Sequence, residues 1–224
     1  IQEFEIIDCH EHLAPEAERL ADSVDVCNLF SHYTHLDLVT AGMSEADFEK
    51  MHDHDYPLEL RWEILRPYLE EIRFGSYARA AFIAARELYG FEDINDETYE
   101  GLSAAMQQRN EPGVYKWILR ERCNIRHSLT QCGKTETESE ILLPVMRLGE
   151  TTHITSWEQV QRIADPLDVR VSSLDDYLAV LDTLFARWKK DGAVGLKSRC
   201  LPYPDTDREK AVHVFEDLRT GAIE

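Results

Sequence analysis

The chain has 224 residues, of which 43% are hydrophobic and 30% charged, and its formal net charge is −19. Four Trp, nine Tyr and eight Phe spread along the chain predict a folded protein rather than a disordered one. The acidic charge argues against nucleic acid or an anionic membrane surface as a partner, and no apolar run approaches the roughly 20 residues of a membrane helix. Five cysteines without CxxC spacing predict reduced thiols and a cytoplasmic location.

The predicted elements are a strand, a long helical region, and then strands that alternate with helices. A first strand covers residues 3–10, and three more cover 124–130, 141–148 and 193–200, with helices over 174–190 and 207–219. Parallel strands joined by helices indicate an α/β fold, here the first half of a (β/α)8 TIM-type barrel. A complete barrel needs about 250 residues, so we expect only part of one.

We expect one domain, apparently truncated, with three stretches. Residues 1–13 carry barrel strand 1 and a metal motif, residues 14–122 form a helical insertion or lid, and residues 123–224 carry strands 2 to 4 with their helices. Within the insertion, a helix from Ser76 to Leu88 is expected to stop at Gly90, and Asp96 is expected to cap another.

The strongest chemical signal is the pair His10 and His12 at the end of the first strand. Side chains alternate along a strand, so both imidazoles are expected on one face, together with Asp8. Two imidazoles placed in this way can bind one divalent cation. The alternative is a pair of surface histidines beyond a strand end. The apolar strand that precedes the pair favours the metal.

Residues 6–13 (Ile-Ile-Asp-Cys-His-Glu-His-Leu) resemble the first-strand signature of the amidohydrolase superfamily, in its branch of amidohydrolase-related metal-dependent hydrolases. The stretch from Tyr77 to Phe91 is similar to the helical insertion of uronate isomerases, which belong to the same superfamily. The resemblance implies a divalent metal, zinc or manganese, held by His10 and His12. The family's further ligands, on strands 5, 6 and 8, have no counterpart here, so we expect the fragment alone to be inactive.

Lys197 ends the predicted fourth strand and shares a face with Ala193 and Gly195, which would place its ammonium in the mouth of a barrel. Residues 192–197 resemble the fourth barrel strand of the hydrolase-like members. Three interpretations stay open: contact with an anionic substrate group, a lysine that reaches solvent, and, as the resemblance implies, a carbamylated lysine that bridges two metals.

Arg147 ends the third strand, and Arg199 lies two residues after Lys197. Both could clamp a substrate carboxylate with paired hydrogen bonds, and helix capping or surface ion pairs are the alternative for each. A second HxH, His52 and His54, has no strand before it and is expected in a solvated loop.

These features predict a metal-dependent hydrolase in which metal-activated water attacks an amide, ester or lactone of a small carboxylate-bearing substrate. Lys197 is the candidate catalytic residue, and Arg147 and Arg199 are the candidate substrate-binding residues. An alternative is a uronate-isomerase-like sugar-acid isomerase or a metal-dependent decarboxylase. A third interpretation is a metal-free scaffold protein. The sequence also allows a homo-oligomer.

Overall fold

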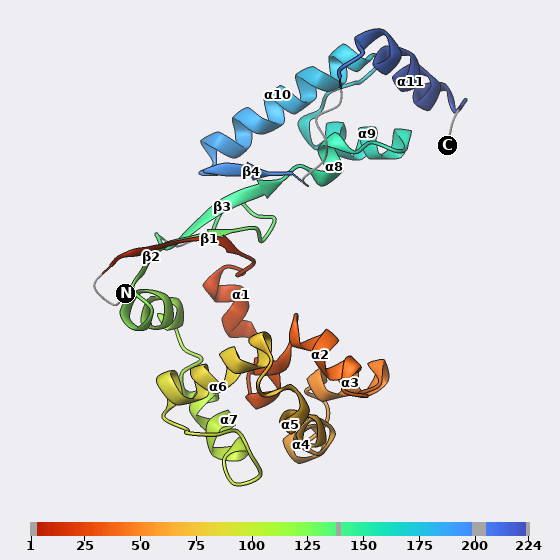
Figure 1. Ribbon diagram of the computed structural model, residues 1–224. Coiled ribbons are helices and arrows are strands. Elements are labelled where there is room, and N and C mark those ends of the chain that lie inside the picture. Colours follow the sequence, from red (N-terminus) through yellow and green to blue (C-terminus); the bar gives the residue numbers. More distant parts are fainter. Residues whose placement is uncertain (1–3, 138–139, 199–204, 223–224) are drawn as a thin grey trace. The chain divides into compact units, whose positions relative to one another are not determined.

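The computed structural model describes residues 4–137, 140–198 and 205–222 (Figure 1). The chain divides into two compact units, of which the first combines the residues up to 15 with those from 125 onward, and the second comprises residues 16–124. Arg199, a predicted substrate-binding residue, lies outside the described residues. No helix in the described ranges is both long and apolar enough to cross a bilayer.

The α-helices and strands in chain order are β1 (Ile6–Glu11), α1 (Glu16–Ala21), α2 (Thr34–Thr40), α3 (Glu45–His52), α4 (Leu58–Leu65), α5 (Leu69–Ile72), α6 (Ser76–Tyr89), α7 (Tyr99–Gln108), β2 (Ile125–Thr130), β3 (Leu142–Arg147), α8 (Gly149–Thr152), α9 (Trp157–Ala164), α10 (Leu174–Lys190), β4 (Gly195–Lys197) and α11 (Arg208–Thr220). Shorter helical turns are η1 (Val26–Phe30), η2 (Arg66–Tyr68) and η4 (Asp165–Leu167), and η3 (Lys116–Arg122) is a π-helix.

The first unit is built on four parallel strands in the spatial order β1-β2-β3-β4. Helices lie between β3 and β4 and after β4 in the chain, as parallel crossovers require. The predicted α/β fold is therefore confirmed, and four consecutive parallel strands are consistent with part of a TIM barrel. The register pairs Val145 with Gly195 and Arg147 with Lys197, so β3 and β4 end side by side.

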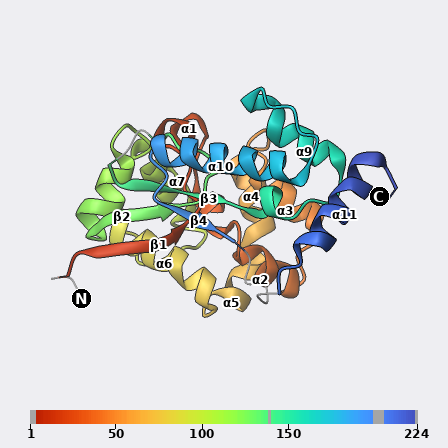
Figure 2. The ribbon, with the colours of Figure 1, turned by 90° about the horizontal axis from the view of Figure 1, so that it is seen from above.

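The helices of the first unit begin where their sequences supply caps. Ser156 and Ser173 each accept a hydrogen bond from a backbone N–H in the first turn, and each forms a full capping box at α9 and α10. Figure 2 shows α10 running alongside β4, as it does in Figure 1. Val160, Tyr177 and Phe215 join α9, α10 and α11 in a small buried cluster.

The second unit is helical and has a core of its own. Its largest fully buried side chains are Phe30, Leu38, Met51, Leu65 and Leu102. The predicted helix at Ser76 is α6, and Gly90 ends it in the left-handed conformation (φ 79°), which glycine adopts without a steric cost. This unit lies between β1 and β2 in the chain, and its status as an insertion into a barrel stays a prediction.

Two expectations in the second unit are wrong. Asp96 does not cap α7, whose N-cap position is Thr98; its carboxylate accepts hydrogen bonds from the Trp62 indole at 2.7 Å and from Arg66 at 3.2 Å. His52 is not in a solvated loop, because it is the last residue of α3 and its Nδ1 lies 3.0 Å from the Phe48 carbonyl oxygen. Asp96 contacts side chains that are remote in sequence, and the surroundings of His52 depend on where α3 ends. Residue type alone predicts neither.

Candidate metal centre

The strand that carries the two histidines contains a β-bulge. Asp8 pairs with Ser128 and Glu11 pairs with Thr130. Between these two pairs β1 therefore contains one residue more than β2. The extra residue interrupts the regular alternation and turns the side chains that follow it. Asp8 and Glu11 are half-buried, whereas His10 and His12 are exposed. The expectation that Asp8 shares one face with both histidines is therefore wrong, since it assumed an unbroken strand.

The imidazoles of His10 and His12 converge despite the bulge. Their Nε2 atoms are 3.2 Å apart, and their ring centroids are 5.2 Å apart. Two nitrogens bound to one tetrahedral zinc at 2.0–2.1 Å are separated by about 3.4 Å. The pair therefore has the spacing that a single divalent cation requires of two of its ligands.

Two positively charged side chains lie against this pair. The Arg147 NH2 nitrogen is 2.7 Å from Nδ1 of His12, and the Lys197 Nζ is 3.2 Å from Nε2 of His10. Arg147 and Lys197 are register partners at the ends of β3 and β4, which explains why both reach the same place. Four residues singled out in the sequence thus come together at the C-terminal ends of β1, β3 and β4 in one parallel sheet, the edge where such sheets usually carry their sites.

Two carboxylates of β1 contact the backbone of the histidines. Asp8 Oδ1 accepts a hydrogen bond from the His10 backbone N–H at 3.2 Å, and Glu11 Oε2 accepts one from the His12 backbone N–H at 3.3 Å. Burial raises the pKa of the Glu11 carboxyl, and the neighbouring charge of Asp8 raises it further. The site therefore places two carboxylates against the backbone of the histidines and two positively charged side chains, Arg147 and Lys197, beside their rings.

Among the described residues, no group of three or more His, Cys, Asp or Glu side chains is arranged to hold a metal ion. His10 and His12 fit as two ligands, and water, substrate or other groups would complete the coordination of a cation bound there. Sequence reasoning missed Ser128 and Thr130, two fully buried hydroxyl residues on β2 that contact the histidine segment. Their one signal was a polar residue at alternate positions of a buried strand.

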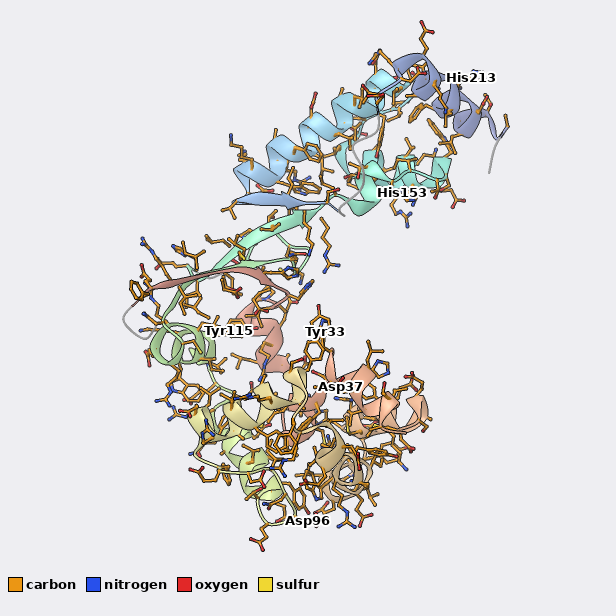
Figure 3. All side chains as sticks on the ribbon, in the orientation of Figure 1. Tyr33, Asp37, Asp96, Tyr115, His153 and His213 are labelled. Atoms are coloured by element: carbon orange, nitrogen blue, oxygen red, sulfur yellow. The ribbon has the colours of Figure 1, made fainter. Side chains whose placement is uncertain are left out.

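The remaining histidines lie elsewhere. His127 Nδ1 is 3.1 Å from the Glu140 carbonyl oxygen, so this strand histidine is hydrogen-bonded away from the pair. His153 and His213 are exposed on the helical part of the first unit (Figure 3). The His32 ring contacts the Tyr33 ring edge-on, and His35 pairs with Glu45, within the second unit.

Comparison with known proteins gives one informative result. No family model matches the chain, and no curated protein matches it. Among solved structures, its fold matches the crystal structure of uronate isomerase from Thermotoga maritima with a TM-score of 0.74 at 16% sequence identity. The alignment covers 99% of this chain and 52% of the other, so the chain spans about half the length of that enzyme. The similarity shows a shared fold.

Proposed function

We propose that this chain carries the metal-binding part of a sugar-acid isomerase active site, with uronates as the substrate class. The observation that carries the proposal is the convergence of the His10 and His12 Nε2 atoms, 3.2 Å apart, with Arg147 and Lys197 in contact with the two rings. The fold shared with a uronate isomerase supports the isomerase over the hydrolase that the sequence favoured.

The residues of the site divide into two roles. His10 and His12 would hold a divalent cation, zinc or manganese, through their Nε2 atoms. Such a cation, when bound, supplies a Lewis acid that polarises a substrate carbonyl or hydroxyl oxygen. Arg147 and Lys197 would bind the carboxylate of the same substrate, the first with a planar pair of donors and the second as a point charge.

A sugar acid is the substrate class that uses both halves of this arrangement. It carries a carboxylate for the two cationic side chains and neighbouring oxygens for the metal. Interconversion of an aldose and a ketose moves hydrogens within the substrate, from one carbon to the next and from one oxygen to the next. Residues that fix both ends of the substrate hold the reacting carbons in one orientation, which lowers the entropic part of the barrier.

A metal-dependent hydrolase is the second candidate, and the position of Lys197 favours it. Its Nζ lies 3.2 Å from the histidine nitrogen that would bind the metal. A lysine so close to the first metal could be carbamylated and hold a second one. In the isomerase the same ammonium stays free to bind a carboxylate, so the two candidates differ in the chemical state of Lys197.

The test combines metal content with turnover of two substrate panels. Plasma mass spectrometry of the purified protein is expected to give about one equivalent of zinc or manganese, and the His10→Ala, His12→Ala double variant is expected to lose it. A matched control is His153→Ala, at an exposed histidine outside the site, which is expected to retain the metal.

The metal-replete full-length protein is then assayed with uronates and with a panel of lactones and amides. Isomerisation of a uronate, lost in the double variant, would support the proposal. Two metal equivalents with a carbamylated Lys197 and lactone turnover would replace it with the hydrolase. Absence of metal after supplementation at neutral pH would overturn both and leave the scaffold interpretation.

A further inference from the structure

Two buried hydroxyls on β2 contact the chain on either side of the histidine pair. The Ser128 hydroxyl donates to Asp8 Oδ2 at 2.7 Å, and the Thr130 hydroxyl donates to the Leu13 carbonyl oxygen at 2.7 Å. Both side chains are fully buried, with 0% relative exposure. A backbone contact joins the same two segments, from the Gln131 N–H to the Glu11 carbonyl oxygen at 2.8 Å.

Residues without a hydroxyl are the usual occupants of a buried strand position. Alanine or valine would fill a buried strand position without placing a polar group away from water, which has a free-energy cost unless the group is hydrogen-bonded. The hydroxyl of Ser128 meets that condition through Asp8 of β1, and the hydroxyl of Thr130 meets it through Leu13, two residues after the end of β1. Compared with valine at the same positions, the two hydroxyls therefore add hydrogen bonds that fix the segment from Asp8 to Leu13.

That segment needs external fixation because it contains the bulge. Between Asp8 and Glu11 the regular pairing with β2 is interrupted, so the ladder does not determine where His10 and His12 point. Asp8, held by Ser128, in turn accepts the hydrogen bond of the His10 backbone N–H. The chain of contacts therefore runs from a buried hydroxyl through a carboxylate to the backbone of a candidate ligand.

We propose that Ser128 and Thr130 are positioning residues that hold the bulged segment of β1 so that the imidazoles of His10 and His12 converge on one cation. The inference rests on the proposed metal-binding function and adds the two residues that preorganise it. Supporting residues behind metal ligands typically change metal affinity by about 10–100-fold when they are removed.

The chain offers a matched control for the test. Thr137 is also buried, and its hydroxyl also donates to a backbone carbonyl at 2.7 Å, but the acceptor is Leu142 at the start of β3. Zinc affinity is measured by chelator competition for the parent, Ser128→Ala, Thr130→Val, Thr130→Ser and Thr137→Val. Thermal unfolding of each metal-free variant reports whether it folds.

We expect affinity to fall about 10–100-fold in Ser128→Ala and Thr130→Val, and to stay at the parent level in Thr137→Val and Thr130→Ser. Parent-like affinity in the two hydroxyl-deleting variants would overturn the proposal, as would an equal loss in Thr137→Val. Ser128→Ala removes a single oxygen and decides the matter where Thr130→Val does not fold.

A second measurement uses no metal. The ring ¹⁵N resonances of His10 and His12 in the metal-free protein are expected to change in Ser128→Ala and Thr130→Val and to stay unchanged in Thr137→Val. Unchanged resonances in every variant would overturn the positioning proposal. If the parent bound no metal, the proposed function would fail, and these resonances would still decide whether the hydroxyls position the histidines.

Discussion

Arg147 donates a hydrogen bond to Nδ1 of His12, with 2.7 Å between the two nitrogens. A guanidinium has donors and no acceptor, so Nδ1 is the acceptor and a neutral His12 ring carries its proton on Nε2. That Nε2 faces Nε2 of His10, to which Lys197 also donates. The two Nε2 atoms that would bind a cation therefore already take part in hydrogen bonds. Arg147 and Lys197 compete with a metal for the imidazoles.

Replacing Arg147 with methionine is expected to tighten metal binding while weakening uronate binding. A metal on Nε2 of His12 requires the ring proton to move to Nδ1, which cannot occur while that nitrogen accepts from the guanidinium. Removal of one hydrogen bond, about 0.5–1.5 kcal/mol, corresponds to roughly 2- to 12-fold in affinity. Chelator competition measures the change. The control is Arg126→Met. Arg126 is an exposed residue near the start of β2, and it pairs with Glu5. Weaker metal binding in Arg147→Met would contradict the competition.

Replacing Arg61 with methionine is expected to destabilise the helical unit by about 3–5 kcal/mol, because it leaves the buried carboxylate of Asp25 without its guanidinium partner. The Arg61 NH2 nitrogen lies 2.5 Å from Asp25 Oδ2, and their side chains are 5% and 8% exposed. Arg61 also donates to the Tyr56 carbonyl oxygen. Urea denaturation measures the loss. Arg86→Met removes an exposed pair with Glu87 and should change stability by less than about 1 kcal/mol. Similar values for both variants would refute this account.

The sequence predicted the part of the site that depends on strand ends. It singled out a histidine pair that ends the first strand and basic residues that end the third and fourth. The carboxyl ends of parallel strands meet at one edge of a sheet, so residues at these positions come close to one another. The contacts of Arg147 with His12 and of Lys197 with His10 have this origin.

The parts that the sequence did not predict depend on contacts between distant residues. A bulge depends on how two strands pair, so the alternation rule placed Asp8 on the wrong face. His54 looked solvated, yet its Nδ1 lies 3.4 Å from Asp25, a residue 29 positions earlier that also pairs with Arg61. A capping preference is local, whereas the Asp96 carboxylate is used by Trp62 and Arg66 of another helical segment.

Cys27 is expected to resist alkylation in the folded protein. Its side chain is fully buried, and burial raises the pKa of its thiol to about 12, with the charge of Asp25 adding to the effect. The thiolate is the reactive form, so its population near pH 8 is very small. Mass spectrometry after iodoacetamide treatment should show rapid labelling of the exposed Cys9 and Cys123 and labelling of Cys27 on denaturation. Labelling of Cys27 at the rate of Cys123 in native protein would contradict its burial.

Acid is expected to destabilise the helical unit through His52. Burial lowers the pKa of its imidazole below the ordinary value of 6.5. Its Nδ1 must donate to the Phe48 carbonyl oxygen, and its buried Nε2 has no hydrogen-bond partner among the described residues. A second proton on the ring would therefore introduce a charge at a buried position, which has a free-energy cost.

The direction of the pH dependence follows from proton uptake. Between the ordinary pKa of 6.5 and the lowered pKa of the folded state, the unfolded chain protonates His52 more than the folded chain does. The free energy of unfolding therefore falls as pH falls through this window, by up to about 1.4 kcal/mol per pH unit from this group. Urea denaturation of the parent and of His52→Gln at pH 7.5, 6.5 and 5.5 isolates the contribution of His52. The difference between the two should change in favour of the variant as pH falls, whereas His153→Gln, at an exposed histidine, should follow the parent. A constant difference between the parent and His52→Gln across this range would mean that His52 does not couple folding to pH.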